Sequence, residues 1–252
     1  MKISRPFALL AVLLLPVVVQ AAEKTPARVD PKALAQLQRM SNRLAAAESF
    51  TYESRALIEV PSKTGQFLTL YSDAQVALQR PDKLRARLGG EAPAFDFYFD
   101  GSTVSAFAPG PKVYSVTKAP ATIDAMLPEL EDETGIRFAT APLLFSNPYR
   151  VLTRNLTSGV VVGPVWVHGV FCTHLAFCSP GVNWEIWIEA GPEALPRRLA
   201  VTFTDRPNGP RTIVEFSKWN LHPWLRARDF QFHPPAQAKE IPFRSVWKST
   251  GR

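Results

Sequence analysis

The feature that most constrains the fold is a two-residue alternation of apolar and polar side chains, which recurs through most of the chain after residue 50. FDFYF places Phe95, Phe97 and Phe99 on one face of a strand, and NWEIWIE does the same with Trp184 and Ile186. This period is typical of β-strands with one buried face. Because short turns rich in Gly, Pro, Asn and Asp separate the segments, they predict an antiparallel sheet.

Two blocks of predicted strands flank a different middle segment. The strands are expected in TYESRALIEV, GQFLTLYSDAQVALQRPDKLRARL, FDFYFDGSTVSAFAP, VYSVTKAP, VVVGPVWVHGVFCTHLAF, NWEIWIEA, PRRLAVTFTD, RTIVEFSKW and DFQFHPP. In the third of these, Asp100-Gly101 is a hairpin turn signal. The middle segment, residues 121–159, has helical composition interrupted by Pro128, Pro142 and Pro148, which predicts two or three short helices. They form either a fixed layer on the sheet or a movable lid.

The segment after residue 29 has the signature of an amphipathic helix. Asp30 suits the N-cap and Pro31 the first helical position. Apolar residues then recur at helical spacing, namely Leu34, Leu37, Met40 and Leu44. The whole pattern predicts one α+β domain with a large antiparallel sheet, an N-terminal helix and a helical insert.

The N-terminus has the layout of a secretory signal peptide, with Lys2 and Arg5 before an apolar run from Phe7 to Val19 and small residues at Val19 and Ala21. A spanning helix needs roughly 20 apolar residues, and this run is shorter; a retained N-terminal anchor is the alternative. We therefore expect a cleaved signal peptide over residues 1–21, a flexible lead-in over 22–29 and a single domain over 30–252, located in the periplasm.

The charge pattern argues against nucleic acid as a partner. The chain has a net charge of +7, which becomes +5 without Lys2 and Arg5. The basic residues are scattered along strands, as in KLRARL and LPRRLAV, whereas nucleic-acid binding needs a clustered footprint. Weak attraction to anionic lipid headgroups is more in keeping with an exported protein.

Residues 170–188, VFCTHLAFCSPGVNWEIWI, contain both cysteines of the chain. Export favours a disulfide, but in one strand Cys172 and Cys178 would lie roughly 20 Å apart, whereas a disulfide needs about 5.5 Å between Cα atoms. We expect no disulfide and a hairpin that turns at SPGVN. A structural zinc ion needs four ligands, and neither His168 nor His222 offers a motif, so no metal is expected. His174 is expected to be half-buried and hydrogen-bonded across the sheet.

No catalytic constellation emerges from the sequence. The pair Cys172/His174 lacks a nucleophile signature. Glu185 and Glu189 share a face, but their backbone positions are about 13 Å apart, beyond the roughly 5–9.5 Å of paired catalytic carboxylates. Asp96 and Asp100 have the same spacing. Motifs such as GxSxG, HExxH and the P-loop are absent from the sequence. We therefore expect a protein that is not an enzyme and has no cofactor. The sequence leaves open one alternative, in which carboxylates from different strands come together in the fold.

A string of motifs resembles a family of predicted bacterial periplasmic proteins of unknown function: HLAF, NWEIWIEAG, LPRRL, SKWN and FQFHPPAQAKEI. The resemblance extends from Pro31 to Phe243. That family looks related to the lipoprotein carriers LolA and LolB in its order of helix, strands, helical insert and strands. Cys178 stands where the family usually has a basic residue, and the lipoprotein cysteine of LolB is absent. No position matches the carriers' lid-anchoring arginine, so their open and closed cycle is not carried over.

The resemblance implies a sheet curved into an unclosed half-barrel, with helices covering its concave side over a cavity that holds acyl chains in the carriers. We predict that the protein binds or carries a lipid or lipoprotein acyl chain in an apolar groove between sheet and helices. Transient contact with the envelope membrane is also expected, and the sequence does not fix the oligomeric state. The alternative is a non-catalytic envelope interaction or scaffolding domain with a closed core. The candidate groove residues are apolar positions of the strands and the insert: Phe95, Phe97, Phe99, Met126, Leu127, Leu130, Leu144, Phe145, Trp184 and Ile186. Which strand face points inward is undecided, because a one-residue register change inverts it.

Overall fold

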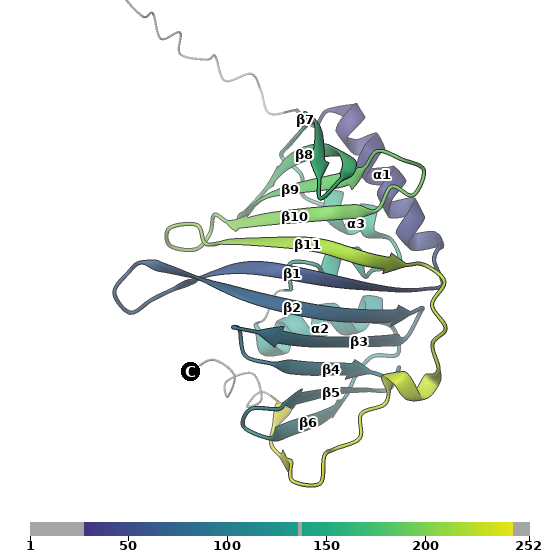
Figure 1. The fold of residues 1–252 in the computed structure, drawn as a ribbon, viewed down its shortest axis with the longest axis vertical. Coiled ribbons are helices and arrows are strands. Elements are labelled where there is room, and N and C mark those ends of the chain that lie inside the picture. The colour runs from purple at the N-terminus through teal and green to yellow at the C-terminus, as the bar shows by residue number, and fades with distance from the viewer. Residues whose placement is uncertain (1–27, 136–137, 244–252) are drawn as a thin grey trace, which may run out of the picture.

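The structure is a computed structural model that describes residues 28–135 and 138–243. The predicted signal peptide and most of the lead-in lie outside the described residues. A single sheet of 12 strands dominates the fold, in the order β12-β6-β5-β4-β3-β2-β1-β11-β10-β9-β8-β7 (Figure 1). Neighbouring strands are antiparallel except for β12 and β6. In the part of the chain that the structure describes, the sheet is open, with β12 and β7 at its edges.

Most strands lie in the predicted segments, but GQFLTLYSDAQVALQRPDKLRARL divides into β2 and β3, VVVGPVWVHGVFCTHLAF divides between β7 and β8, and β12 was not predicted. Their bounds are β1 Ser49–Pro61, β2 Phe67–Gln79, β3 Lys83–Gly90, β4 Phe95–Phe99, β5 Thr103–Ala108, β6 Val113–Lys118, β7 Ser158–Val167, β8 Val170–Ser179, β9 Val182–Glu189, β10 Pro196–Phe203, β11 Arg211–Asn220 and β12 Lys239–Glu240. The turn at Asp100-Gly101 is confirmed. The Asp100 carboxylate accepts hydrogen bonds from the backbone N–H groups of Ser102 and Thr103, and Gly101 adopts a φ of 91°, which glycine tolerates at no steric cost.

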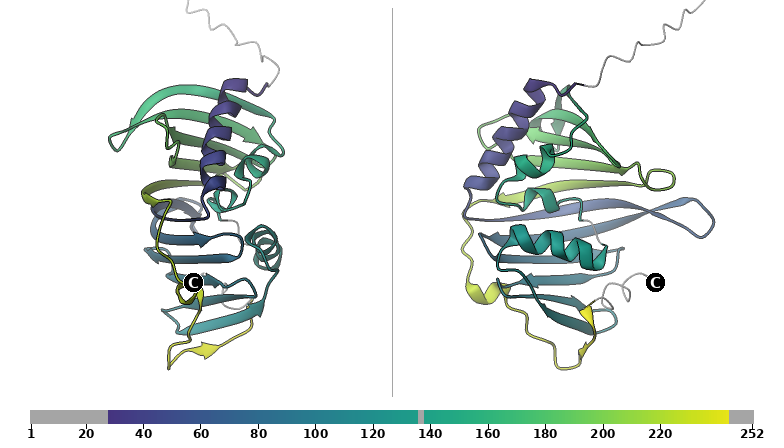
Figure 2. Two further views of the ribbon diagram at one scale, coloured as in Figure 1. Left: turned by 90° about the vertical axis from the view of Figure 1, so that its right-hand side faces the viewer. Right: turned by 180° about the vertical axis from the view of Figure 1, so that it is seen from behind.

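The helices lie together on the concave face of the sheet, which we call the helix face (Figure 2). They are α1 (Pro31–Ala46), α2 (Ile123–Thr134), the 3₁₀ turn η1 (Ala141–Leu143) and α3 (Pro148–Thr153). α1 crosses the half of the sheet that contains β7 to β11, and α2 covers the region of β2 to β4. The predicted α+β class, the unclosed sheet and both helical elements are confirmed.

The start of α1 follows the predicted capping chemistry. The Asp30 side chain accepts a hydrogen bond of 2.8 Å from the backbone N–H of Lys32, and Pro31 occupies the first turn. Val29, assigned to the flexible lead-in by the sequence, forms a parallel bridge with Gly159 of β7. The adjacent backbone N–H of Asp30 donates to the Gly159 carbonyl. Val29 is therefore part of the folded domain.

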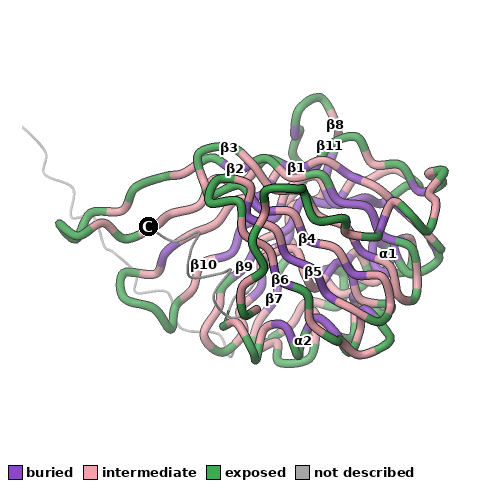
Figure 3. Tube along the Cα trace, turned by 90° about the horizontal axis from the view of Figure 1, so that it is seen from below, coloured by how far each residue is buried: buried purple, intermediate pink, exposed green. Residues whose placement is uncertain are grey.

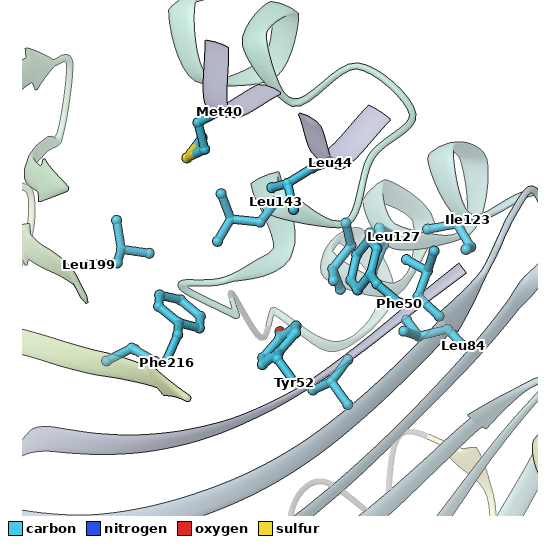
Figure 4. Packing of buried hydrophobic residues seen from close by; sticks show 14 of the residues in the cluster. Met40, Leu44, Phe50, Tyr52, Leu84, Ile123, Leu127, Leu143, Leu199 and Phe216 are labelled. Carbon is cyan, nitrogen blue, oxygen red and sulfur yellow. The ribbon is translucent and has the colours of Figure 1, made fainter. Parts of the chain in front are cut away.

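The main hydrophobic core lies between the helices and the helix face of the sheet (Figure 3). Figure 4 shows side chains of α1, α2 and η1 meeting those of β1, β3, β10 and β11. The largest fully buried side chains include Phe50, Phe99, Phe177, Leu37 and Met40. No described helix combines the length and apolar character needed to cross a membrane.

One strand prediction is wrong. DFQFHPP, residues 229–235, is not a strand: the 3₁₀ turn η2 (Ala227–Phe230) takes up its start, and an irregular segment leads from there to β12. The Asp229 carboxylate accepts hydrogen bonds from the backbone N–H and the guanidinium of Arg226, which favours the turn. Two consecutive prolines follow, and they supply no N–H to a β-ladder. Phe232 instead packs against the ring of Tyr98 at 5.6 Å between centroids.

Candidate functional site

The helical insert, residues 121–157, does not fill the space above the sheet. A cavity of about 440 Å³, which we call the outer cavity, lies between it and the strands β9 and β10. Leu127, Phe145 and Leu152 line its helical wall, and Trp184, Leu199 and Phe203 line its sheet wall. Most of its surface is apolar, while Glu131, Arg154 and Asn155 contribute polar groups. Its size and character are those of small-molecule sites, which typically measure 300–1,000 Å³.

A second, smaller space of about 80 Å³ adjoins the first, and we call it the inner cavity. The two share Leu127, Phe138 and Ala141 as lining residues. No charged side chain lines the inner cavity, whose walls come from the insert and from β1, β2, β3 and β4. The two cavities therefore lie next to each other beneath the insert, with Leu127, Phe138 and Ala141 in both linings.

Small side chains and broken helices create these spaces. On the sheet wall of the inner cavity, Ser54 pairs with Ala74 across β1 and β2, and Ala86 lies on the neighbouring β3. Above them the insert changes from α2, which contains Pro128, to the 3₁₀ turn η1. Small residues below an interrupted helical layer leave volume that regular helix-on-sheet packing would fill.

The structure distributes the ten predicted groove residues unevenly. All lie in or against the main core. Three line the outer cavity, namely Leu127, Phe145 and Trp184. Four line the inner cavity, namely Phe97, Leu127, Leu130 and Leu144. The remaining four belong to neither lining and pack as core: Phe95, Phe99, Met126 and Ile186.

Sequence reasoning missed part of the lining. Leu199, Val201 and Phe203 of β10 face the outer cavity. Their period-two spacing in LAVTF placed them on one face, but nothing in the sequence aligned that face with the insert. Tyr52 of β1 and Thr140 of the insert line the inner cavity and were also missed.

Tyr52 brings an unusual polar group to the inner cavity. Its side chain is 2% exposed, and its hydroxyl has no hydrogen-bond partner among the described residues. Burial raises the pKa of Tyr52 to about 12, and the nearby Thr140 side chain offsets this only partly. Figure 4 shows the ring rising from β1 with its hydroxyl directed toward the helical layer.

Arg80 joins the two parts of the helical layer. Its guanidinium donates to the backbone carbonyl of Leu144 in the insert at 3.1 Å and to that of Leu44 in α1 at 3.3 Å. The same group lies 5.9 Å from the centroid of the Phe50 ring. Burial lowers the pKa of Arg80, and the charge of Asp124 opposes that change. No sequence motif had identified this arginine.

The cysteine segment lies away from both cavities. β8 runs unbroken through Cys172 and Cys178, which are free thiols in this structure. The predicted hairpin is confirmed, because Ser179 pairs with Val182 across Pro180-Gly181. Cys172 belongs to a second small core with Val167, Trp187 and Ala200, on the opposite, open face of the sheet, and burial raises its pKa.

The histidine and the glutamates of the same region make hydrogen bonds and ion pairs with neighbouring side chains. His174 Nε2 lies 2.9 Å from Glu185 Oε2 across β8 and β9, which confirms the predicted cross-sheet bond. Its ring stacks on Trp187 at 4.1 Å. Glu185 also pairs with Arg211, and Glu189 pairs with Arg197 at 2.6 Å. Among the described residues no group of three or more His, Cys, Asp or Glu side chains is placed to hold a metal ion.

The sequence model of one protein family, described as predicted periplasmic protein (DUF2092), matches residues 33–244. The chain belongs to this family. It is therefore a periplasmic protein, as the sequence predicted, and the predicted family resemblance is confirmed. No curated protein sequence matches the chain.

Several solved structures are similar to this protein at low sequence identity. Lipoprotein LppX of Mycobacterium tuberculosis is 15% identical with a TM-score of 0.46, covering 76% of this chain and 96% of its own. LprF from Mycobacterium bovis is 14% identical with a TM-score of 0.47, covering 84% and 99%. A domain from Vibrio parahaemolyticus, described as outer membrane lipoprotein-sorting, is 12% identical with a TM-score of 0.39, covering 79% and 96%.

Proposed function

We propose that this periplasmic protein binds or carries a lipid or lipoprotein acyl chain between the helical insert and the sheet. The observation that supports this most directly is the outer cavity, about 440 Å³ with mostly apolar walls. Burying an acyl chain gains roughly 0.8 kcal/mol per CH₂, so even a partly enclosed chain would be held. Exposed polar residues of the insert, Arg154 and Asn155, would meet the headgroup to which the chain is joined.

The domain organisation is part of this proposal. A signal peptide over residues 1–21 would be cleaved near Ala21 or Ala22, followed by a lead-in over 22–29 and a single domain over 30–252. N-terminal sequencing of protein from fractionated cells tests it. A mature chain that begins at Met1 would overturn the cleavage.

The decisive experiment titrates the delipidated protein with a fluorescent fatty acid. We expect saturable binding, weakened by Leu127→Glu without global unfolding, because Leu127 lines the outer cavity, which gives an introduced charge a route to solvent. Leu37→Glu is the matched control: Leu37 is 0% exposed in α1 and lines neither cavity, so an unpaired buried charge should unfold the protein. Val162→Glu, at an exposed position of β7, should change neither property.

A second function is supported by a different surface. The β7–β8 hairpin exposes Trp166 at 68%, Val162 at 55% and Phe171 at 44%. Exposed apolar patches often mark interaction sites, which favours the scaffolding alternative. Mass spectrometry of lipids that copurify with the protein separates the two. Absence of bound lipid, absence of saturable binding, and unfolding by Leu127→Glu would together leave the interaction domain as the better account.

A further inference from the structure

We infer that the inner cavity recognises a neutral ester carbonyl of the bound acyl chain, through a hydrogen bond donated by the Tyr52 hydroxyl. This inference rests on the acyl-chain binding proposed above and adds the chemical class of the ligand. The protein would then select esterified chains over plain hydrocarbon and over ionised fatty acids.

The first support is the unpaired hydroxyl itself. Tyr52 is 2% exposed and lines the inner cavity, and its hydroxyl makes no hydrogen bond of normal length and angle to the described residues; the Thr140 side chain beside it interacts with it only enough to lower its pKa slightly. Buried hydroxyls are rarely left unpaired, because such a group loses its bonds to water without replacement. The same position occupied by phenylalanine would fill the core equally well, so the oxygen is the feature that needs a role.

The second support is the chemistry of the walls. The raised pKa of Tyr52, about 12, keeps the hydroxyl protonated and therefore a donor at neutral pH. No charged side chain lines the inner cavity, so a carboxylate or phosphate placed there would be a buried, uncompensated charge. Ser54 and Thr140, both in the lining, add hydroxyl groups suited to a neutral polar atom.

The third support is size and position. About 80 Å³ accommodates a few heavy atoms, since one water takes roughly 30 Å³ in the liquid. An ester group fits this space, and the rest of the lipid would lie in the outer cavity and at its opening. Because the inner cavity adjoins the outer one at Leu127, Phe138 and Ala141, a chain that lies in the outer cavity would bring its carbonyl to Tyr52.

The test compares hexadecyl acetate with octadecane, each displacing a fluorescent apolar dye from the full-length mature protein. Tyr52→Phe should weaken ester binding about tenfold, the effect of one lost hydrogen bond, and leave hydrocarbon binding unchanged. Tyr149→Phe, a half-buried tyrosine of α3 outside both linings, is the matched control and should change neither. Equal loss for both ligands, or no loss, overturns the ester inference while acyl binding stands. Failure of the wild type to bind either ligand overturns the proposed function instead.

A spectroscopic measurement keeps the inference testable should Tyr52→Phe fold poorly. The infrared carbonyl band of an isotope-labelled ester should move to lower wavenumber when bound to the wild type, because a donated hydrogen bond weakens the C=O bond. A band at the position seen in alkane solvent overturns the inference. A synthetic diacylglyceryl lipopeptide, run through the same assays, separates the sources: the same Tyr52 dependence indicates a lipoprotein, and dependence for the small ester alone indicates a free neutral lipid.

Discussion

The N-terminal helix and the helical insert cover the same sheet in different ways. α1 is an unbroken helix of 16 residues whose buried positions, Ala33, Leu37, Met40 and Leu44, form one stripe against the strands. The insert is divided into α2, η1 and α3, and both cavities lie beneath it. α1 completes the hydrophobic core, whereas the insert leaves two cavities between itself and the sheet. The difference indicates that continuity of the helix, more than apolar content, separates a filled core from the cavities in this fold.

The largest expected effect tests that difference directly. Leu37→Ala should lower the free energy of unfolding by about 3–5 kcal/mol, because it opens a new hole in close-packed core. Leu127→Ala should cost about half as much, since its side chain already borders both cavities and little new void forms. Urea denaturation of both variants measures the contrast. Equal losses would mean that the insert packs as tightly as α1.

A smaller effect concerns Tyr52 at alkaline pH. Its folded pKa of about 12 lies above the unfolded value of about 10. Its contribution to stability is therefore complete below pH 10 and is lost between about pH 10 and 12, where only the unfolded chain releases the proton. The loss should reach roughly 2–3 kcal/mol, and Tyr52→Phe should abolish it. Denaturation midpoints across this range, with phenolate absorbance as the monitor, provide the measurement; an identical alkaline decline in both proteins would contradict it.

A third prediction concerns Arg80, which links α1 to the insert. Arg80→Met keeps the apolar length of the side chain but removes both bonds to the carbonyls of Leu44 and Leu144. We expect a net destabilisation of only about 1 kcal/mol, because relief of the buried charge offsets the lost bonds. Amide exchange should nevertheless accelerate in η1 relative to α1. Uniform acceleration across both elements would show that Arg80 does not hold the insert separately.

The smallest effect on stability is expected for Glu215, which lies on the open face of the sheet, away from both α1 and the insert. Burial would raise the pKa of Glu215, but hydrogen bonds from His168 and Arg198 outweigh it and leave the pKa below its usual value. The pair interactions thus stabilise the protein above the unfolded pKa of about 4.3 and are lost as pH falls through the folded value. Glu215→Gln should cost less than about 1 kcal/mol at pH 7, with no cost under strongly acidic conditions and no change in ligand binding. A changed ligand affinity would instead show that the open face and the helix face are energetically coupled.

Local signals explain how much the sequence could predict. The cap at Asp30, the turn at Asp100-Gly101 and the hairpin around Pro180-Gly181 depend on neighbours in sequence, and all three were predictable. The error over DFQFHPP has the same origin, because alternating aromatics suggested a strand, whereas the hydrogen bonds that the Asp229 carboxylate accepts from Arg226 favour a 3₁₀ turn.

The site was only partly predictable, because it depends on contacts between distant segments. Phe97 and Phe95 have the same spacing pattern, yet only Phe97 lines a cavity. Tyr52 and Thr140 meet only after the insert folds over β1. Period-two spacing tells which residues share a face, whereas the position of each strand under the insert follows from the sheet order.

The position of β1 has a consequence for how the chain folds. β1 lies between β2, its neighbour in sequence, and β11, which pairs Asn220 with Thr51 across most of the chain. A chain synthesised from its N-terminus completes β1 to β6 as successive hairpins while the other edge of β1 has no partner. Such long-range pairing is slow to form, and an open strand edge invites aggregation. The middle of the finished sheet therefore closes late in biogenesis, after β7 to β10 have been synthesised, and a nascent chain is most exposed to holdase chaperones until β11 arrives.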